Sequence, residues 1–165
     1  MSVPVLVVFV FIASIWFWNS LYVIKEWERG VVLRLGKIQA ATQGPGLQLI
    51  AWPVDTLYRI SVKLQTMAVV AQTLRAQGDV DIRASATCSF RVVEAVRALS
   101  EVQEYHFALY ELVKMTLREV VGKMTVDDIE YAPERISEQV KESLERDANK
   151  WGLEILSFEM KSEGQ

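Results

Sequence analysis

The chain opens with a long apolar run that stops abruptly at a cluster of charges. Residues 1–24 contain no charged side chain, whereas four of the five residues 25–29 are charged. About 20 helical residues, rising roughly 1.5 Å each, cover the ~30 Å hydrocarbon core of a bilayer. Three aromatic rings of the kind that prefer the headgroup level lie near the charged end, namely Trp16, Trp18 and Tyr22. The pattern predicts a transmembrane helix over residues 1–24.

Two other interpretations fit this run less well. A cleavable signal peptide needs a positive charge before the run and small residues at a cleavage site, but Ala13-Ser14 leads into the bulky stretch Ile15–Trp18 and no Lys or Arg comes earlier. A buried core helix is usually shorter than this. The nearest cations, Lys25 and Arg29, follow the run. The positive-inside rule therefore favours a single-pass N-terminal anchor with the remainder in the cytoplasm.

Alternating apolar and polar positions predict strands in the first half of the remainder. The residues over Tyr22–Leu35 favour a strand that Gly30 breaks once, and the alternation is clear over Tyr58–Gln65. Over Asp79–Val92, seven apolar residues alternate with seven polar ones. That stretch is typical of an antiparallel strand with one face in water.

Helical spacing replaces the alternation after residue 92. Apolar residues recur three and four positions apart over Tyr105–Val121, which predicts a helix. Thr125–Asp128 has the pattern of a capping box and opens a short helical turn. A second long helix is expected over Pro133–Trp151, closed by Gly152. Because Leu153–Met160 is again strand-like, the order of anchor, strands, helices and strand predicts an α+β fold.

Composition narrows the function. The 18 basic and 21 acidic side chains are interspersed, with a net charge of −3, so no basic block for nucleic acid is present. With one cysteine, Cys88, and one histidine, His106, an intrachain disulfide and a structural zinc site are both excluded. The sequence has no glycine-rich phosphate loop and no serine elbow. We therefore expect neither a metal nor a cofactor.

Catalytic residues are equally scarce. A nucleophilic pair could only join Cys88 to His106, but a small buried cysteine and a surface histidine are far commoner than such a pair. A serine nucleophile needs a base, and a Ser–Lys dyad on Lys114 or Lys123 stays open without any feature in its favour. We therefore expect that the protein is not an enzyme.

Three motifs stand in order behind the anchor. They are ERGVVLRLGK at 28–37, GPGL at 44–47 followed by Pro53-Val54-Asp55, and TLREVVG at 116–122 followed by Trp151-Gly152-Leu153. Together they closely resemble the signatures of the stomatin–prohibitin–flotillin family, also called SPFH or band-7, and within it the stomatin or slipin branch. The resemblance runs from about residue 22 to residue 161.

The resemblance implies an SPFH domain over residues 25–161, with a twisted antiparallel sheet packed with helices beside the membrane. It also implies a homo-oligomeric scaffold that organises membrane patches and regulates membrane proteins such as proteases or channels. Its implied partners are the lipid bilayer, further copies of the chain, and an NfeD-type membrane protein or a membrane protease. A lipid-binding module at the membrane surface is the alternative, and a membrane-associated protease is a third, weaker one.

The sequence departs from the family pattern in places. A long Ala/Glu-rich helix usually follows the last strand, whereas a tail of residues 162–165 follows here. The family's QTTLR is altered in Val113–Arg118, and Thr73–Gly78 lacks the usual acidic pattern. Arg118 is a candidate for a subunit interface, although an arginine on such a helix is more often a paired or snorkelling surface residue.

The apolar stretch Leu47–Val54 is the remaining candidate for function. At about eight residues it is too short to span a bilayer. It is either a buried core strand or a loop that dips into the headgroup region with Trp52 as its anchor. The second interpretation makes Leu47, Leu49, Ile50 and Trp52 membrane-contacting, together with Trp16, Trp18 and Tyr22.

Overall fold

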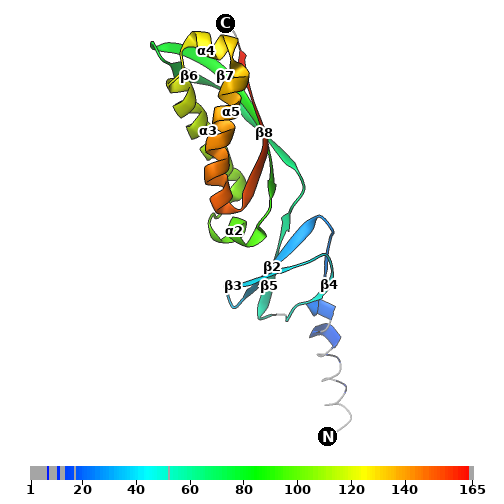
Figure 1. Ribbon diagram of the computed structural model, residues 1–165. Coiled ribbons are helices and arrows are strands. Elements are labelled where there is room, and N and C mark those ends of the chain that lie inside the picture. Colours follow the sequence, from blue (N-terminus) through cyan, green and yellow to red (C-terminus); the bar gives the residue numbers. More distant parts are fainter. Residues whose placement is uncertain (1–6, 8–10, 12–13, 17, 52, 164–165) are drawn as a thin grey trace. The chain divides into compact units, whose positions relative to one another are not determined.

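The computed structural model describes residues 7, 11, 14–16, 18–51 and 53–163, and divides the chain into two compact units (Figure 1). The first unit comprises residues 1–62 and the second residues 63–165. Both are built from antiparallel sheets, and helices pack on the sheet of the second. The α+β fold expected from the sequence is therefore confirmed.

The first unit contains two small sheets. A two-stranded ribbon pairs β1 with β4, and a three-stranded sheet has the order β3-β2-β5. The strands are β1 (Leu21–Ile24), β2 (Glu28–Arg34), β3 (Lys37–Gln43), β4 (Gly46–Leu49) and β5 (Asp55–Ser61). All of these pairs are antiparallel.

The end of the expected anchor is a correction. Helical residues occur up to Ser20, but Leu21–Ile24 form β1 instead of the last turn of a helix. The side chains of Asn19 and Ser20 donate to the carbonyls of Ile15 and Trp16, each at 2.9 Å. These bonds mark the end of the helical stretch, and β4 then supplies backbone partners for β1.

The rest of the expected anchor is only partly visible. Residues 1–6, 8–10, 12–13 and 17 lie outside the described residues. Among the residues that are described, no helix combines the length and the apolar character needed to cross a bilayer. The single-pass anchor stays a prediction.

Gly30 does not break the strand in which it lies. It sits inside β2, opposite Gln43 of β3 and Arg59 of β5. A Cβ at this position would lie 2.6 Å from Cδ1 of Ile24 and 2.8 Å from Cδ1 of Leu57. The glycine therefore makes room for β1 to pack on the sheet, which is a tertiary reason that a local pattern does not reveal.

The second unit is one three-stranded sheet covered by helices on one face. The sheet order is β6-β7-β8 (Gln65–Ala76, Val80–Val92 and Leu153–Glu163), with α3 (Tyr105–Gly122) and α5 (Pro133–Ala148) lying along it (Figure 1). Shorter elements connect them, namely α2 (Ala95–Ser100), α4 (Val126–Tyr131) and the 3-10 helix η1 (Asn149–Trp151).

The core of the second unit follows the periodicities of the sequence. In β7 the buried residues alternate from Ala84 to Val92. In α5 they recur at every fourth position from Ile136 to Ala148. The Thr125 capping box forms, Pro133 occupies the first turn of α5, and Gly152 follows η1 at a φ of 70°. These sequence predictions are confirmed.

Candidate functional site

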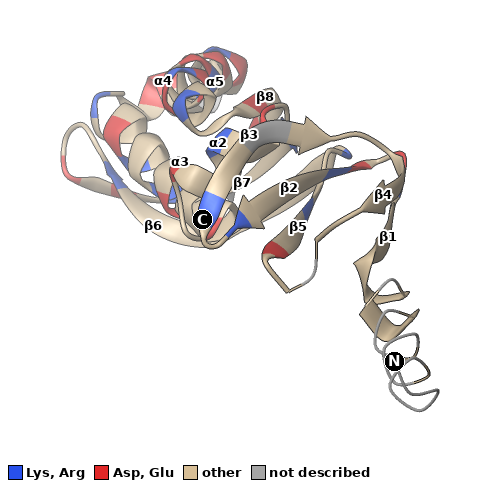
Figure 2. Cartoon of the chain, turned by 90° about the horizontal axis from the view of Figure 1, so that it is seen from below, with Lys and Arg blue, Asp and Glu red and all other residues tan. Residues whose placement is uncertain are grey.

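The ribbon of the first unit presents an apolar face to its surroundings. Leu21 lies opposite Leu49 and Val23 opposite Leu47, so these four side chains share one face, which we call the ribbon face. Val23 is 63% exposed, and Leu47 and Leu49 are each 66% exposed. Neither β1 nor β4 carries a charged residue (Figure 2). Large exposed apolar patches are typical of surfaces that contact a membrane or another protein.

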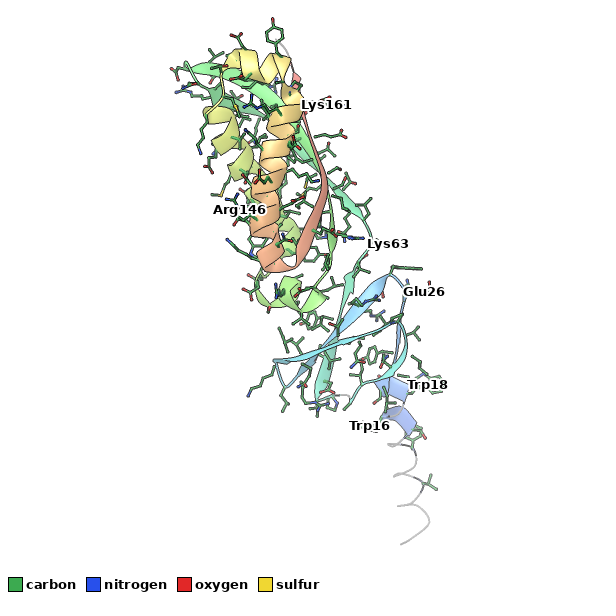
Figure 3. The ribbon with its side chains drawn as sticks, viewed as in Figure 1. Trp16, Trp18, Glu26, Lys63, Arg146 and Lys161 are labelled. Carbon is green, nitrogen blue, oxygen red and sulfur yellow. The ribbon has the colours of Figure 1, made fainter. Side chains whose placement is uncertain are left out.

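The residues just before the ribbon extend its apolar character. Trp18 is 82% exposed and Trp16 is 46% exposed, on the helical turn that precedes β1 (Figure 3). Tyr22 is different, because it lies opposite Gln48 on the other face of the ribbon and is half-buried. Of the three rings expected at the headgroup level, the two tryptophans are therefore the better exposed.

The stretch from Leu47 to Val54 is neither a buried strand nor a simple loop. Its first residues belong to β4 and are exposed, but Ile50 is only 3% exposed and donates its N–H to the carbonyl of Ser20 at 2.8 Å. Ile50 is therefore withdrawn as a membrane-contacting residue, because its side chain faces the interior of the unit. Trp52 lies outside the described residues.

An ion pair that the sequence did not suggest lies beside this stretch. Arg34, at the end of β2, donates from Nε and Nη2 to the two carboxylate oxygens of Asp55, at 2.8 and 2.9 Å. The Asp55 side chain is 5% exposed and that of Arg34 is 56% exposed. The bonds from the guanidinium hold the pKa of Asp55 below its ordinary value. Arg34 and Asp55 also line a cavity of about 170 Å³ together with Leu49.

We expect this ion pair to make the stability of the first unit depend on pH in the acid range. Because the folded-state pKa of Asp55 is lowered, its contribution to stability is complete above the unfolded value of about 3.9 and is lost as pH falls through the folded pKa. We expect Asp55→Asn to lower the free energy of unfolding of the first unit at neutral pH. Below about pH 4 the variant should lose less further stability than the unaltered protein, because it has no carboxylate at this position to protonate. Hydrogen exchange of β2 and β5 over a pH series measures both effects. Parallel curves for the two proteins would contradict the assignment.

The second unit does not assemble the catalytic pairs considered above. Cys88 is fully buried, and burial raises the pKa of its thiol to about 11, so it is not a thiolate at neutral pH. His106 stacks on Tyr105 with ring centroids 4.4 Å apart. Lys114 and Lys123 bond to carboxylates of Glu111 and Glu119, at 3.1 and 2.6 Å, and neither bonds to a serine within the described part of the chain.

Arg118 stays a candidate without support. It is exposed on α3 and forms no ion pair with any of the residues that the structure describes. Those same residues also contain no group of three or more His, Cys, Asp or Glu side chains that could hold a metal ion.

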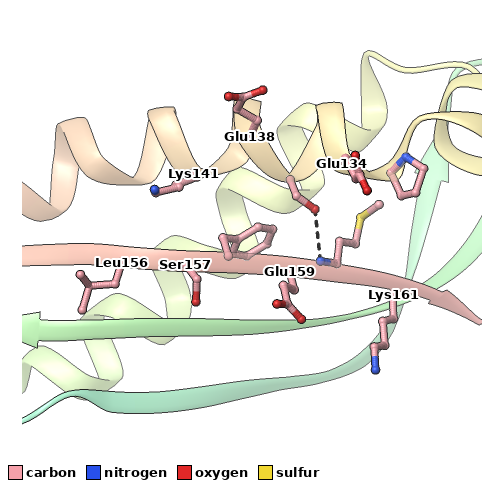
Figure 4. A pocket seen from close by; sticks show the side chains of 11 residues that line it. Glu134, Glu138, Lys141, Leu156, Ser157, Glu159 and Lys161 are labelled. Carbon is pink, nitrogen blue, oxygen red and sulfur yellow. Dashed lines mark hydrogen bonds between the residues drawn. The ribbon is translucent and has the colours of Figure 1, made fainter.

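A groove of about 610 Å³ runs between α5 and the outer edge of β8 (Figure 4). The backbone N–H of Met160 points into it and donates to Oγ of Ser137 at 3.3 Å. Its rim carries both signs of charge, with Glu138 and Lys141 on α5 and Glu159 and Lys161 on β8. Such a lining selects no single ligand charge. Within the described residues no further strand pairs with this edge of β8, although Ser137 of α5 already accepts one of its N–H groups.

Comparison with known proteins gives a consistent family. Residues 22–162 match the SPFH domain / Band 7 family. Stomatin-like protein 3 of Homo sapiens is 32% identical over 157 residues, covering 94% of this chain and 53% of that protein. A stomatin homolog of Pyrococcus horikoshii is 28% identical over 160 residues, covering 97% of this chain and 58% of that protein. The chain thus spans about half the length of these two relatives.

The family match agrees with the architecture described above. It begins at residue 22, within β1, and ends within β8, so the ribbon belongs to the matched region. Proteins of this family are generally membrane-associated scaffolds without enzymatic activity. The motifs, the antiparallel sheets with their helices and the relatives agree, and the chain belongs to the SPFH/band-7 family, in its stomatin branch.

Proposed function

We propose that this protein is a membrane-bound scaffold whose first unit rests on the bilayer through the ribbon face. The observation that carries the proposal is the exposure of Val23, Leu47 and Leu49 on one uncharged face. Fully burying an exposed Val or Leu side chain contributes about 1.5–3 kcal/mol, and the exposed part of these three side chains would contribute a share of that on contact with lipid. Trp16 and Trp18 would sit beside them at the headgroup level.

We further propose that the second unit carries the self-association of the scaffold. Its sheet ends in β6 on one side and β8 on the other, and neither outer edge is paired with another strand in the described part of the chain. Open edges are sites where a further strand can add. Arg118 on α3 is exposed and free to reach a carboxylate of a second copy.

The wider role follows from the family resemblance. An oligomer held at the membrane would gather lipids and membrane proteins into patches and regulate proteases or channels there. Its partners would include an NfeD-type membrane protein or a membrane protease. The cations Lys25 and Arg29 favour a cytoplasmic location for both units behind a single-pass anchor.

Contact of the ribbon face with lipid is tested by a fluorescent label. The full chain carrying Leu49→Cys is labelled with the polarity-sensitive fluorophore NBD and reconstituted into phosphatidylcholine vesicles. We expect blue-shifted emission that nitroxide-labelled lipids quench. The matched control is Met115→Cys, which is 67% exposed on α3 of the second unit and should emit as in water. Water-like emission from both positions would overturn the proposed membrane contact.

Self-association is tested separately, by native mass measurement of the full chain in detergent. A discrete oligomer supports the scaffold. A monomer bound to lipid would instead favour a lipid-binding module at the membrane surface. Charge reversal by Arg118→Glu should weaken the oligomer if this arginine lies at the interface, whereas Lys150→Glu, at another exposed cation of the second unit, serves as the matched control.

A further inference from the structure

The turn between β2 and β3 holds a leucine in an unusual position. Only Leu35 and Gly36 separate the two strands, with φ angles of 50° and 80°. Tight two-residue turns with two positive φ angles favour Asn or Asp followed by Gly. A leucine adopts this conformation with strain, and yet its side chain is 80% exposed to solvent. Neither the backbone nor the packing of the first unit accounts for a leucine here.

The hairpin tip is fixed to the segment that follows the ribbon in the chain. The N–H of Leu35 donates to the carbonyl of Val54 at 3.0 Å, and the ion pair of Arg34 with Asp55 fixes the end of β2. Arg34 and Leu49 line the same cavity of about 170 Å³, so the last residue of β2 and the end of the ribbon border one cavity. Val54, whose carbonyl accepts that bond, is 42% exposed and adds apolar surface beside the tip.

The exposed leucine stands between two cations. Lys37 lies opposite Arg34 in the pairing of β2 with β3, and both side chains are exposed. Lys37 forms no ion pair within the described residues. Asp55 uses Nε and Nη2 of Arg34, so Nη1 is not used by this pair. One apolar side chain flanked by cationic ones has the chemistry of a contact with a negatively charged lipid surface.

We propose that the β2–β3 tip is a binding site for the phosphate groups of anionic phospholipids. Leu35 inserts among the acyl chains near the headgroups, while Lys37 and Nη1 of Arg34 bind lipid phosphate oxygens. The site rests on the proposed membrane contact of the ribbon face and gives it a lipid preference. A two-residue turn between paired strands would hold the leucine at a fixed depth in the membrane, which a long flexible loop could not do.

The test measures the polarity around the tip in the full chain. Leu35→Cys is labelled with NBD and reconstituted into vesicles of phosphatidylcholine, or of phosphatidylcholine mixed with phosphatidylglycerol. The unaltered chain gives the labelling background, since Cys88 is buried. We expect blue-shifted, nitroxide-quenched emission with phosphatidylglycerol. Adding Lys37→Gln should lower the ratio of docked to undocked tips about fivefold in these vesicles, and little in neutral ones.

Controls separate this site from the proposed function. Lys150 is a cation of the second unit, and its side chain is 69% exposed. Lys150→Gln should leave the signal at position 35 unchanged. Lipid-like emission at position 49 with water-like emission at position 35 overturns the tip site and leaves the membrane contact standing. Water-like emission at both positions overturns both. An equal signal at position 35 in neutral and anionic vesicles would overturn the preference for anionic lipid.

Discussion

Replacing Gly152 with alanine is expected to lower the free energy of unfolding of the second unit by about 2–4 kcal/mol, from backbone strain and overpacking together. Gly152 follows η1 at a φ of 70°, a conformation in which a Cβ is strained. A Cβ there would also lie 2.7 Å from the carbonyl oxygen of Glu94. Because that oxygen belongs to the backbone, it cannot move aside as the end of a long side chain could.

The position matters because it joins two parts of the sheet. The carbonyl of Gly152 accepts the N–H groups of Val93 and Glu94, at 2.9 and 3.1 Å, where β7 passes into α2. A shift of Gly152 to relieve the clash would lengthen these bonds at the start of β8. The strain therefore spreads to the central strand pair and is not confined to the turn.

The matched control is Gly122→Ala, at the last residue of α3. A Cβ there would have only the carbonyl oxygen of Arg75 nearby, at an ordinary distance of 3.7 Å. Alanine in a helix is favoured over glycine by up to about 1 kcal/mol, so this variant should be neutral or more stable. Urea unfolding, monitored by circular dichroism, measures the free energy of unfolding of both variants. Equal losses of stability for the two variants would show that the Gly152 geometry is not the cause.

The second unit is predictable from the sequence because its elements are long and buried on one side. From Ala84 to Val92 the residues of β7 alternate between buried and more exposed, and α5 buries every fourth residue from Ile136 to Ala148. One-sided burial converts directly into a period of two or of about four in the sequence. Local signals such as the Thr125 capping box then set the helix ends.

The first unit is less predictable because its strands are short and their partners distant in sequence. β1 and β4 have four residues each, too few to display a period, and among the described residues they pair with each other and with no further strand. The apolar residues of β1 continue the apolar run before it, so composition does not mark the change from helix to strand. The local pattern predicts a break at Gly30, because the reason for this glycine, the close approach of Ile24, comes from another sheet.

The candidate site was therefore predicted in part. Leu47, Leu49, Trp16 and Trp18 are exposed, as a membrane contact requires. Ile50 could not be distinguished from its neighbours, since only pairing with β1 decides which side chains turn inward. The ERGVVLRLGK motif predicts a turn at Gly36 but does not by itself indicate a binding site at the hairpin tip. A Gly one residue before Lys37, between two β-rich stretches, was the available signal for a two-residue turn.

Replacing Ile24 with alanine should destabilise the first unit by about 2–5 kcal/mol, the usual cost of truncating a buried isoleucine. Ile24 is 2% exposed, and its Cδ1 lies only 2.6 Å from the position that a Cβ at residue 30 would occupy. No β-carbon is available at Gly30 to fill the space, so the cavity persists unless the ribbon moves. The side chain of Ile24 is thus what seats the ribbon on the β3-β2-β5 sheet.

The adjacent residue gives a matched control on the same strand. Val23 points to the opposite face and is 63% exposed, so Val23→Ala should change stability by no more than about 0.5 kcal/mol. Hydrogen exchange of β2 and β5, in the full chain in detergent, reports the difference between the two variants.

The two variants, Ile24→Ala and Val23→Ala, also distinguish packing of the ribbon on the sheet from contact of the ribbon with lipid. With the label at position 49, Ile24→Ala should broaden the emission, because a ribbon that is no longer seated samples several depths. Val23→Ala removes only part of the ribbon face, so it should lower lipid contact without loosening the fold. If Val23→Ala raised hydrogen exchange in β2 as much as Ile24→Ala did, Val23 would have to pack inside the protein. The ribbon face would then not be free to meet a membrane.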